Sequence, residues 1–140
     1  MFCRPRPLAV YVPLVRVGDL VFTTGQGPTV DVKPMFTRTL RREFTEEPRY
    51  KAAQLCILNC LACVKNLIGD LDEVQQVVKL LGCVASVDGF GRQPWVMNGP
   101  SGLLVKLYGD KGKRARSAIG TNQLPLDIPV EVEMIVRVWD

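Results

Sequence analysis

The 140-residue sequence contains no histidine. This absence excludes a Ser-His-Asp triad, a Cys-His protease pair and a His-ligated zinc or iron site, because each of these needs imidazole. Catalysis near neutral pH must therefore use carboxylates, Arg, Lys, Tyr, Cys or backbone groups.

Long apolar runs are missing as well. The apolar stretches fall well short of the roughly 20 residues that a membrane span needs. The stretch that follows Arg4 and Arg6 is interrupted by Pro13, and no cleavage site of small residues comes after it. We therefore expect a soluble protein without a membrane partner.

The five cysteines do not form the even, loop-rich pattern of a disulfide framework. Cys60 and Cys63 make a CxxC motif, but together with Cys56 they lie at i, i+4 and i+7 of an apolar helical stretch. Free cysteine at such positions behaves as a small hydrophobic residue. We predict that these three cysteines pack in the core, and we expect a reducing compartment, the cytoplasm.

The composition is that of a globular protein, with 47% hydrophobic and 23% charged residues. The length favours one domain over residues 1–140, with residues 1–7 as a loose lead-in rich in Pro and Arg. The net charge of +4 suits an anionic ligand without requiring one. The basic residues gather in two groups: Arg38, Arg41 and Arg42, and then Lys111, Lys113, Arg114 and Arg116.

The periodicity predicts, in chain order, a hairpin, a helix, a strand, a second helix and two further strands. The expected ranges are 15–17 and 20–24 for the hairpin, 45–68 and 95–108 for the helices, 77–87 for a central strand, and 114–119 and 130–138 for the last two strands. Residues 25–44 are irregular, and we expect a long loop there that contains at most a short strand.

This order of elements predicts an α+β fold in which two helices cover one face of a sheet. The other face would still carry apolar side chains from several strands. Subunits that pack these faces together would bury them, so we expect a symmetric oligomer.

Two separated segments resemble the signatures of the reactive-intermediate deaminase family, the YjgF-like or endoribonuclease L-PSP-like proteins. The first is Tyr11-Val12 followed by residues 17–28, VGDLVFTTGQGP. The second is residues 115–120, ARSAIG, followed by Leu124-Pro125 and by VEVE at residues 130–133. The order and spacing agree at both ends of the chain.

The resemblance implies a chorismate-mutase-like α+β fold, with a mostly antiparallel sheet and two helices on one face. It also implies a homotrimer with sites in the clefts between subunits. The implied reaction is hydrolysis of 2-imino acids, released as enamines, to 2-keto acids and ammonia without a cofactor or a metal. Nucleic acid is not an expected partner; a small substrate that bears a carboxylate is.

The resemblance also assigns roles to residues. Arg116 matches the arginine that binds the substrate carboxylate, and Glu131 matches the glutamate that holds the attacking water. From the residues alone, Arg116 is better explained as an exposed arginine on a strand edge. Glu131 could likewise be an ordinary outward residue of an amphipathic strand, although Glu133 fits that description better. The implied substrate-binding positions are Tyr11, Gly25, Asn98, Ala118 and, as an apolar wall, Phe90 or Trp95.

Some segments depart from the family pattern. Ala118 stands where many members carry Cys, and residues 31–44 and 89–95 differ from the simplest deaminases, which indicates a divergent subgroup. Two other functions stay open: an RNA-binding protein or endoribonuclease, favoured by the basic groups and Trp95, and a trimeric protein that binds a small ligand without turnover.

Overall fold

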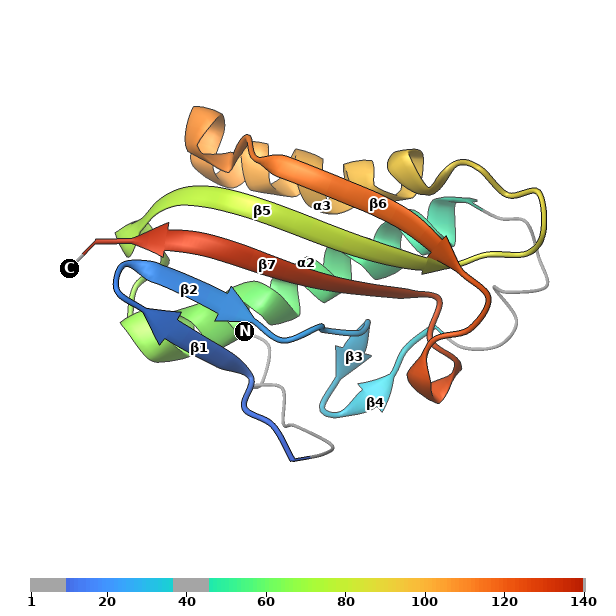
Figure 1. Ribbon diagram of the computed structural model, residues 1–140, viewed down its shortest axis with the longest axis horizontal. Coiled ribbons are helices and arrows are strands. Elements are labelled where there is room, and N and C mark those ends of the chain that lie inside the picture. The colour runs from blue at the N-terminus through green and yellow to red at the C-terminus, as the bar shows by residue number, and fades with distance from the viewer. Residues whose placement is uncertain (1–9, 37–45, 140) are drawn as a thin grey trace.

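The computed structural model describes residues 10–36 and 46–139 and, of Glu46, the backbone alone. Its centre is a five-stranded sheet in the order β1-β2-β7-β5-β6, with two long helices behind it (Figure 1). The strands are β1 (Leu14–Val17), β2 (Leu20–Thr23), β5 (Val74–Ala85), β6 (Ala115–Thr121) and β7 (Val130–Val138). The helices are α2 (Glu46–Ile68) and α3 (Gln93–Tyr108). A small second sheet pairs β3 (Thr29–Val30) with β4 (Lys33–Pro34), and three 3-10 helices are η1 (Leu71–Glu73), η2 (Gly109–Gly112) and η3 (Pro125–Asp127).

The sheet is mostly antiparallel. β1 pairs with β2, β2 with β7 and β7 with β5 in antiparallel register, whereas β5 and β6 run parallel. A parallel pair needs a crossover connection, and α3 provides it between β5 and β6. The predicted α+β class with a mostly antiparallel sheet and two helices is therefore confirmed.

The helices cover one face of the sheet because α2 carries small side chains where it meets the strands. Ala53, Cys56 and Cys60 are fully buried there. The thiols of Cys56 and Cys60 donate to the carbonyls of Val130 and Val132 on β7, at 3.5 and 3.4 Å. The predicted packing role of the helical cysteines is confirmed, whereas Cys3 lies outside the described residues.

Contrary to the expectation that every apolar stretch is too short, α2 is long and apolar enough, by length and composition, to cross a membrane. Its apolar side chains are instead those of a core helix, since Ile57, Leu61 and Val64 belong to the central cluster of buried residues. Near the end of the helix the two sides differ: Leu67 is exposed, whereas Ile68 packs against the core.

The other boundaries differ little from the predicted ones. β5 begins at Val74, where a strand was expected from residue 77, and α3 begins at Gln93 because Pro94 fits within the first helical turn. The irregular segment contains the short hairpin of β3 and β4. The lead-in, residue 45 at the expected start of the first helix and the first basic group (Arg38, Arg41 and Arg42) lie outside the described residues.

Candidate active site

Arg116 lies on β6 and points to the face of the sheet that the helices cover. Its register neighbour on β5 is Leu80, which is fully buried in the core. The Nη1 group of Arg116 donates to Oδ1 of Asn98 at 2.9 Å and to Oγ of Ser101 at 3.0 Å, both on α3. The structure thus brings together two of the predicted site residues, Arg116 and Asn98.

Arg116 has neutral partners. Within the described part of the chain, no Asp or Glu oxygen lies within 4.0 Å of its guanidinium nitrogens, and its Nε and Nη2 groups have no acceptor. The charge is therefore uncompensated, and one edge of the planar fork stays available. That edge matches the two oxygens of a carboxylate.

Ala118 follows Arg116 on the same side of β6, level with Gly82 on β5, and packs against the core. Phe90 and Trp95 contact α2 instead. The Arg49 guanidinium lies 5.0 Å from the centre of the Phe90 ring, and Tyr50 and Trp95 have ring centres 5.3 Å apart. These two aromatic residues thus pack between α2 and the start of α3.

Glu131 lies near the start of β7 and is half-buried. Its pKa is raised, first by burial and then by the negative charge of Glu133. Gly25 lies against it so closely that a Cβ atom at this position would be 2.9 Å from the Glu131 Cδ. The structure therefore joins a second pair of predicted site residues, Gly25 and Glu131, and a side chain at position 25 would force the Glu131 side chain to move.

The loop that holds Gly25 is fixed to β7 and α2. Gln26 and Val132 exchange two backbone hydrogen bonds of 2.8 and 3.0 Å. The buried Asn59 of α2 donates through Nδ2 to the carbonyls of Gly27 at 2.9 Å and Thr29 at 3.0 Å. Tyr11 lies on the segment that leads into β1 and is 45% exposed.

Arg116 and Glu131 project from opposite faces of the sheet. Val130 and Val132 are fully buried beneath the helices, so the intervening Glu131 points to the open face. Across β5, the residue of β6 that is level with Glu131 is Ile119, not Arg116. A single chain therefore does not bring the two predicted catalytic residues to one point.

The buried cysteines have no reactive character. Burial raises the pKa of the Cys60 thiol to about 12, and it raises that of Cys56 well above the usual range. Cys83, half-buried on the open face, also has a raised pKa because of burial and the charges of Glu131 and Glu133. Thiols are nucleophilic as thiolates, so these three are inert near neutral pH.

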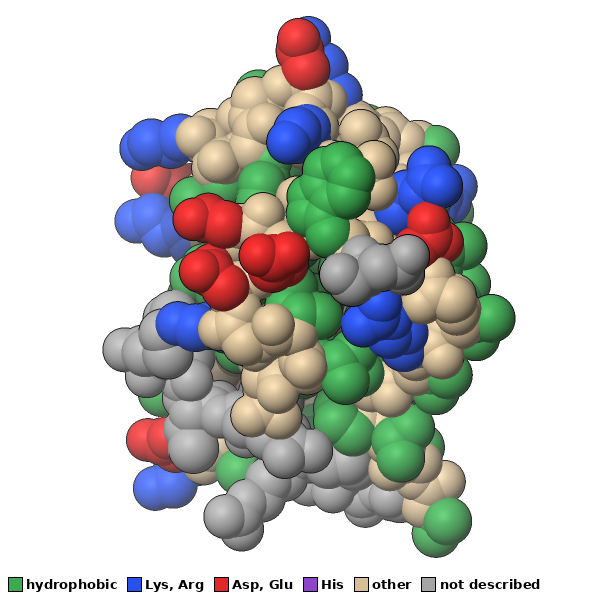
Figure 2. Space-filling model, turned by 90° about the vertical axis from the view of Figure 1, so that its left-hand side faces the viewer, with side chains coloured by type: hydrophobic (Ala, Val, Ile, Leu, Met, Phe, Trp, Pro, Cys, Tyr) green, Lys and Arg blue, Asp and Glu red, His purple; other side chains and the backbone are tan. Residues whose placement is uncertain are grey.

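A hollow of about 680 Å³ lies at the end of the sheet where β5 begins and β7 ends. Figure 2 shows acidic and basic side chains around apolar ones on this end. None of the predicted site residues lines the hollow, which includes the ion pair of Arg137 and Asp19 at 2.6 Å. Over residues 10–36 and 46–139, no three His, Cys, Asp or Glu side chains converge as metal ligands.

Sequence reasoning missed Ser101 and Asn59. Ser101 follows Asn98 by one helical turn, and that spacing was the available signal, because residues at i and i+3 lie on the same side of a helix. Asn59 gives no such signal. A buried polar residue within an apolar helix is expected to form a hydrogen bond. The sequence does not indicate that its acceptors are the carbonyl groups of Gly27 and Thr29.

A comparison with known protein families matches residues 5–137 to the family described as "YjgF/chorismate mutase-like, putative endoribonuclease". The chain is 36% identical over 132 residues to Protein TCP17 of Trypanosoma cruzi, with 94% of this chain and 82% of that protein covered. Two crystal structures are similar. The protein Atu1372 of unknown function from Agrobacterium tumefaciens has a TM-score of 0.88 and 39% identity, over 94% of this chain and 83% of that one. A "putative endoribonuclease" from Shewanella oneidensis has a TM-score of 0.90 and 26% identity, over 96% and 89%.

These matches span nearly the whole chain and agree with the observed fold. The chain therefore belongs to the YjgF/chorismate mutase-like family. The family resemblance inferred from the two sequence signatures is confirmed.

Proposed function

We propose that this protein hydrolyses reactive 2-imino acids, and the enamines in equilibrium with them, to 2-keto acids and ammonia. The observation that carries the proposal is the arrangement of Arg116. Two neutral acceptors, Asn98 and Ser101, fix its guanidinium and leave its charge and its outer edge for the carboxylate of a small substrate.

The opposite orientations of Arg116 and Glu131 support a site built from two subunits. The open face of the sheet carries exposed apolar side chains, among them Val15, Phe22 and Ile119. Faces of this kind are buried when copies of a chain associate. We propose a homotrimer in which Arg116 of one subunit and Glu131 of its neighbour face the same cleft.

In the proposed reaction, Arg116 holds the substrate carboxylate and thereby places the imine carbon beside the water bound to Glu131. The water oxygen forms a bond to that carbon while Glu131 accepts a proton. The resulting carbinolamine expels ammonia after protonation of its nitrogen, and the C=N bond is replaced by C=O. One water is consumed, and no electrons are transferred, so the step needs no redox cofactor. Positioning and charge provide the acceleration.

The test generates 2-iminopropanoate in situ and traps the remaining imine with semicarbazide. We expect Arg116→Ala to lower kcat/KM by about a hundred-fold, as loss of a charge-assisted contact implies, and Glu131→Ala to lower kcat. Arg16→Ala and Glu73→Ala, which remove the same charges elsewhere, serve as matched controls. A wild-type rate no faster than that of buffer would contradict the proposal for this substrate.

The family description also includes an endoribonuclease, and the second basic group would suit RNA. RNA cleavage that is lost in Arg116→Ala and kept through further purification would favour this alternative. Carboxylate binding without turnover would instead favour a small-ligand-binding protein.

A further inference from the structure

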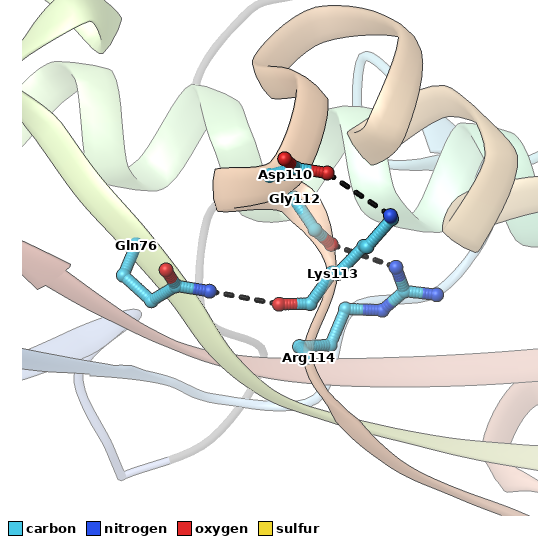
Figure 3. Close-up of polar contacts among 5 residues, drawn as sticks. All are labelled: Gln76, Asp110, Gly112, Lys113 and Arg114. Atoms are coloured by element: carbon cyan, nitrogen blue, oxygen red, sulfur yellow. Dashed lines mark hydrogen bonds and ion pairs between the residues drawn. The ribbon is translucent and has the colours of Figure 1, made fainter.

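Arg114 precedes Arg116 by two residues, and its guanidinium approaches the same serine of α3. Its Nη1 group donates to the Gly112 carbonyl at 2.7 Å and to the Ser101 carbonyl at 3.5 Å, whereas Arg116 uses the Ser101 hydroxyl. Figure 3 shows the Arg114 side chain against the turn that contains Gly112. The two arginines therefore flank one residue, Ser101, on the covered side of β6.

Neither arginine is neutralised within the described residues. No carboxylate oxygen there lies within 4.0 Å of the Arg114 guanidinium, and Asp110, which lies on the same turn, pairs with Lys113 at 3.0 Å (Figure 3). The Nε group of Arg114 is buried and has no acceptor in this part of the chain. Burial and then the charge of Arg116 lower the pKa of Arg114.

Two uncompensated guanidinium groups close together repel each other, and an anion between them relieves that repulsion. We propose that Arg114 is a second anion contact of the site built on Arg116, and that the substrate is a 2-imino acid with a second carboxylate in its side chain. This inference rests on the proposed deamination. Because both arginines contact Ser101, a short substrate fits, such as the imine of a four-carbon dicarboxylic acid.

The assignment of the two carboxylates follows from the reaction. Arg116 holds the carboxylate beside the imine carbon, and Arg114 holds the distal one. The hydrolysis itself is unchanged: 2-iminobutanedioate and water give 2-oxobutanedioate and ammonia. Arg114 takes no part in proton transfer, so its contribution is to substrate preference.

The test compares kcat/KM for 2-iminobutanedioate and 2-iminopropanoate, each generated in situ. We expect the wild type to prefer the dicarboxylate by about ten-fold, which is what one charge-assisted hydrogen bond contributes. Arg114→Gln should abolish that preference, and Arg114→Lys should reduce it. Lys106→Gln, which removes an exposed positive charge from the same end of α3, should leave it unchanged.

A wild type that prefers the monocarboxylate overturns the inference. So does a folded Arg114 variant, Gln or Lys, that keeps the wild-type preference for the dicarboxylate. Calorimetric binding of succinate and propanoate separates this outcome from failure of the proposed function, because it needs no turnover. The wild type should bind succinate about ten-fold more tightly than propanoate. Arg114→Gln should bind the two ligands with equal affinity. Salt-sensitive binding of a short single-stranded RNA, with no preference for succinate, would overturn the inference in favour of a nucleic-acid site.

Discussion

At the scale of single residues, the charge of Arg116 is available to a ligand because its partner Asn98 is neutral. The side chains are 2.9 Å apart, and Asn98 is exposed, so a change there does not disturb the core. Asn98→Asp would place a carboxylate against the guanidinium and neutralise it. We expect the affinity for a carboxylate ligand to fall by about ten-fold or more, because the introduced carboxylate would take the charge-assisted contact that the ligand makes with Arg116.

Calorimetry with propanoate measures this effect. Asn66→Asp introduces the same charge at an exposed position of α2 and provides the matched control. Equal affinities for the wild type and Asn98→Asp would show that Arg116 does not bind the carboxylate.

Glu133 influences the proposed base through its charge. Glu131 must be ionised to accept a proton, so kcat/KM should fall as the pH falls through its raised pKa. Glu133 lies on the same side of β7 and contributes to that rise. Glu133→Gln should therefore move the acid limb of the pH profile to lower pH.

The measurement is kcat/KM against pH for the wild type, Glu133→Gln and the control Glu73→Gln, whose residue lies in η1. An acid limb that stays in place, or that moves to higher pH, would be evidence against Glu131 as the base.

At the scale of elements, the sequence predicts those whose side chains repeat regularly. The alternation of β7 gives its bounds, Val130–Val138, and the small residues of α2 give the face that meets the sheet. These patterns are local consequences of burial. The strands of the β3–β4 hairpin are only two residues long, so they show no such pattern. Its turn residues, Asp31 and Val32, are also not the ones that a sequence predicts for positive φ angles.

The candidate site is less accessible to sequence reasoning for a related reason. Family motifs indicate Arg116 and Asn98, which the structure brings together. The helical spacing of Ser101 from Asn98 places both on one side of α3. That spacing does not show that this side of α3 approaches β6, which is what makes Ser101 and Arg114 relevant. Their contacts at 3.0 and 3.5 Å come from tertiary packing.

The turn between β3 and β4 stores strain that one substitution should release. Asp31 and Val32 have φ angles of 50° and 69°, as a type I′ turn requires. This region costs an L-residue about 1–2 kcal/mol, and more for a β-branched one. Val32 is 44% exposed, so little apolar burial is lost on its removal.

Val32→Gly should thus raise the free energy of unfolding by about 1 kcal/mol after the larger entropy of the unfolded chain is counted. The corresponding rise in Tm is about 3 °C. Val30→Gly, in β3 with no positive φ, is the matched control and should lower Tm. A lower Tm for Val32→Gly would show that the turn is not strained.

At the scale of the whole molecule, the opposite orientations of Arg116 and Glu131 on the sheet determine how many chains the proposed site needs. Arg116 projects toward the helices and Glu131 toward the open face. If the site requires both, a trimer with three equivalent interfaces places one from each of two neighbours in every cleft. Arg116→Ala and Glu131→Ala subunits are then each inactive alone but complementary when mixed.

Mixing the two variants therefore tests the proposed assembly directly. After joint unfolding and refolding at equal concentrations, about one interface in four should join an intact Arg116 to an intact Glu131, because each subunit of the pair is chosen at random. We expect about a quarter of the wild-type rate for 2-iminopropanoate, and none when the variants are refolded separately and then combined without exchange. Sedimentation should give the mass of three chains. Absence of any recovered rate in mixed trimers, with the wild type active after the same treatment, would place both residues' functions within one chain.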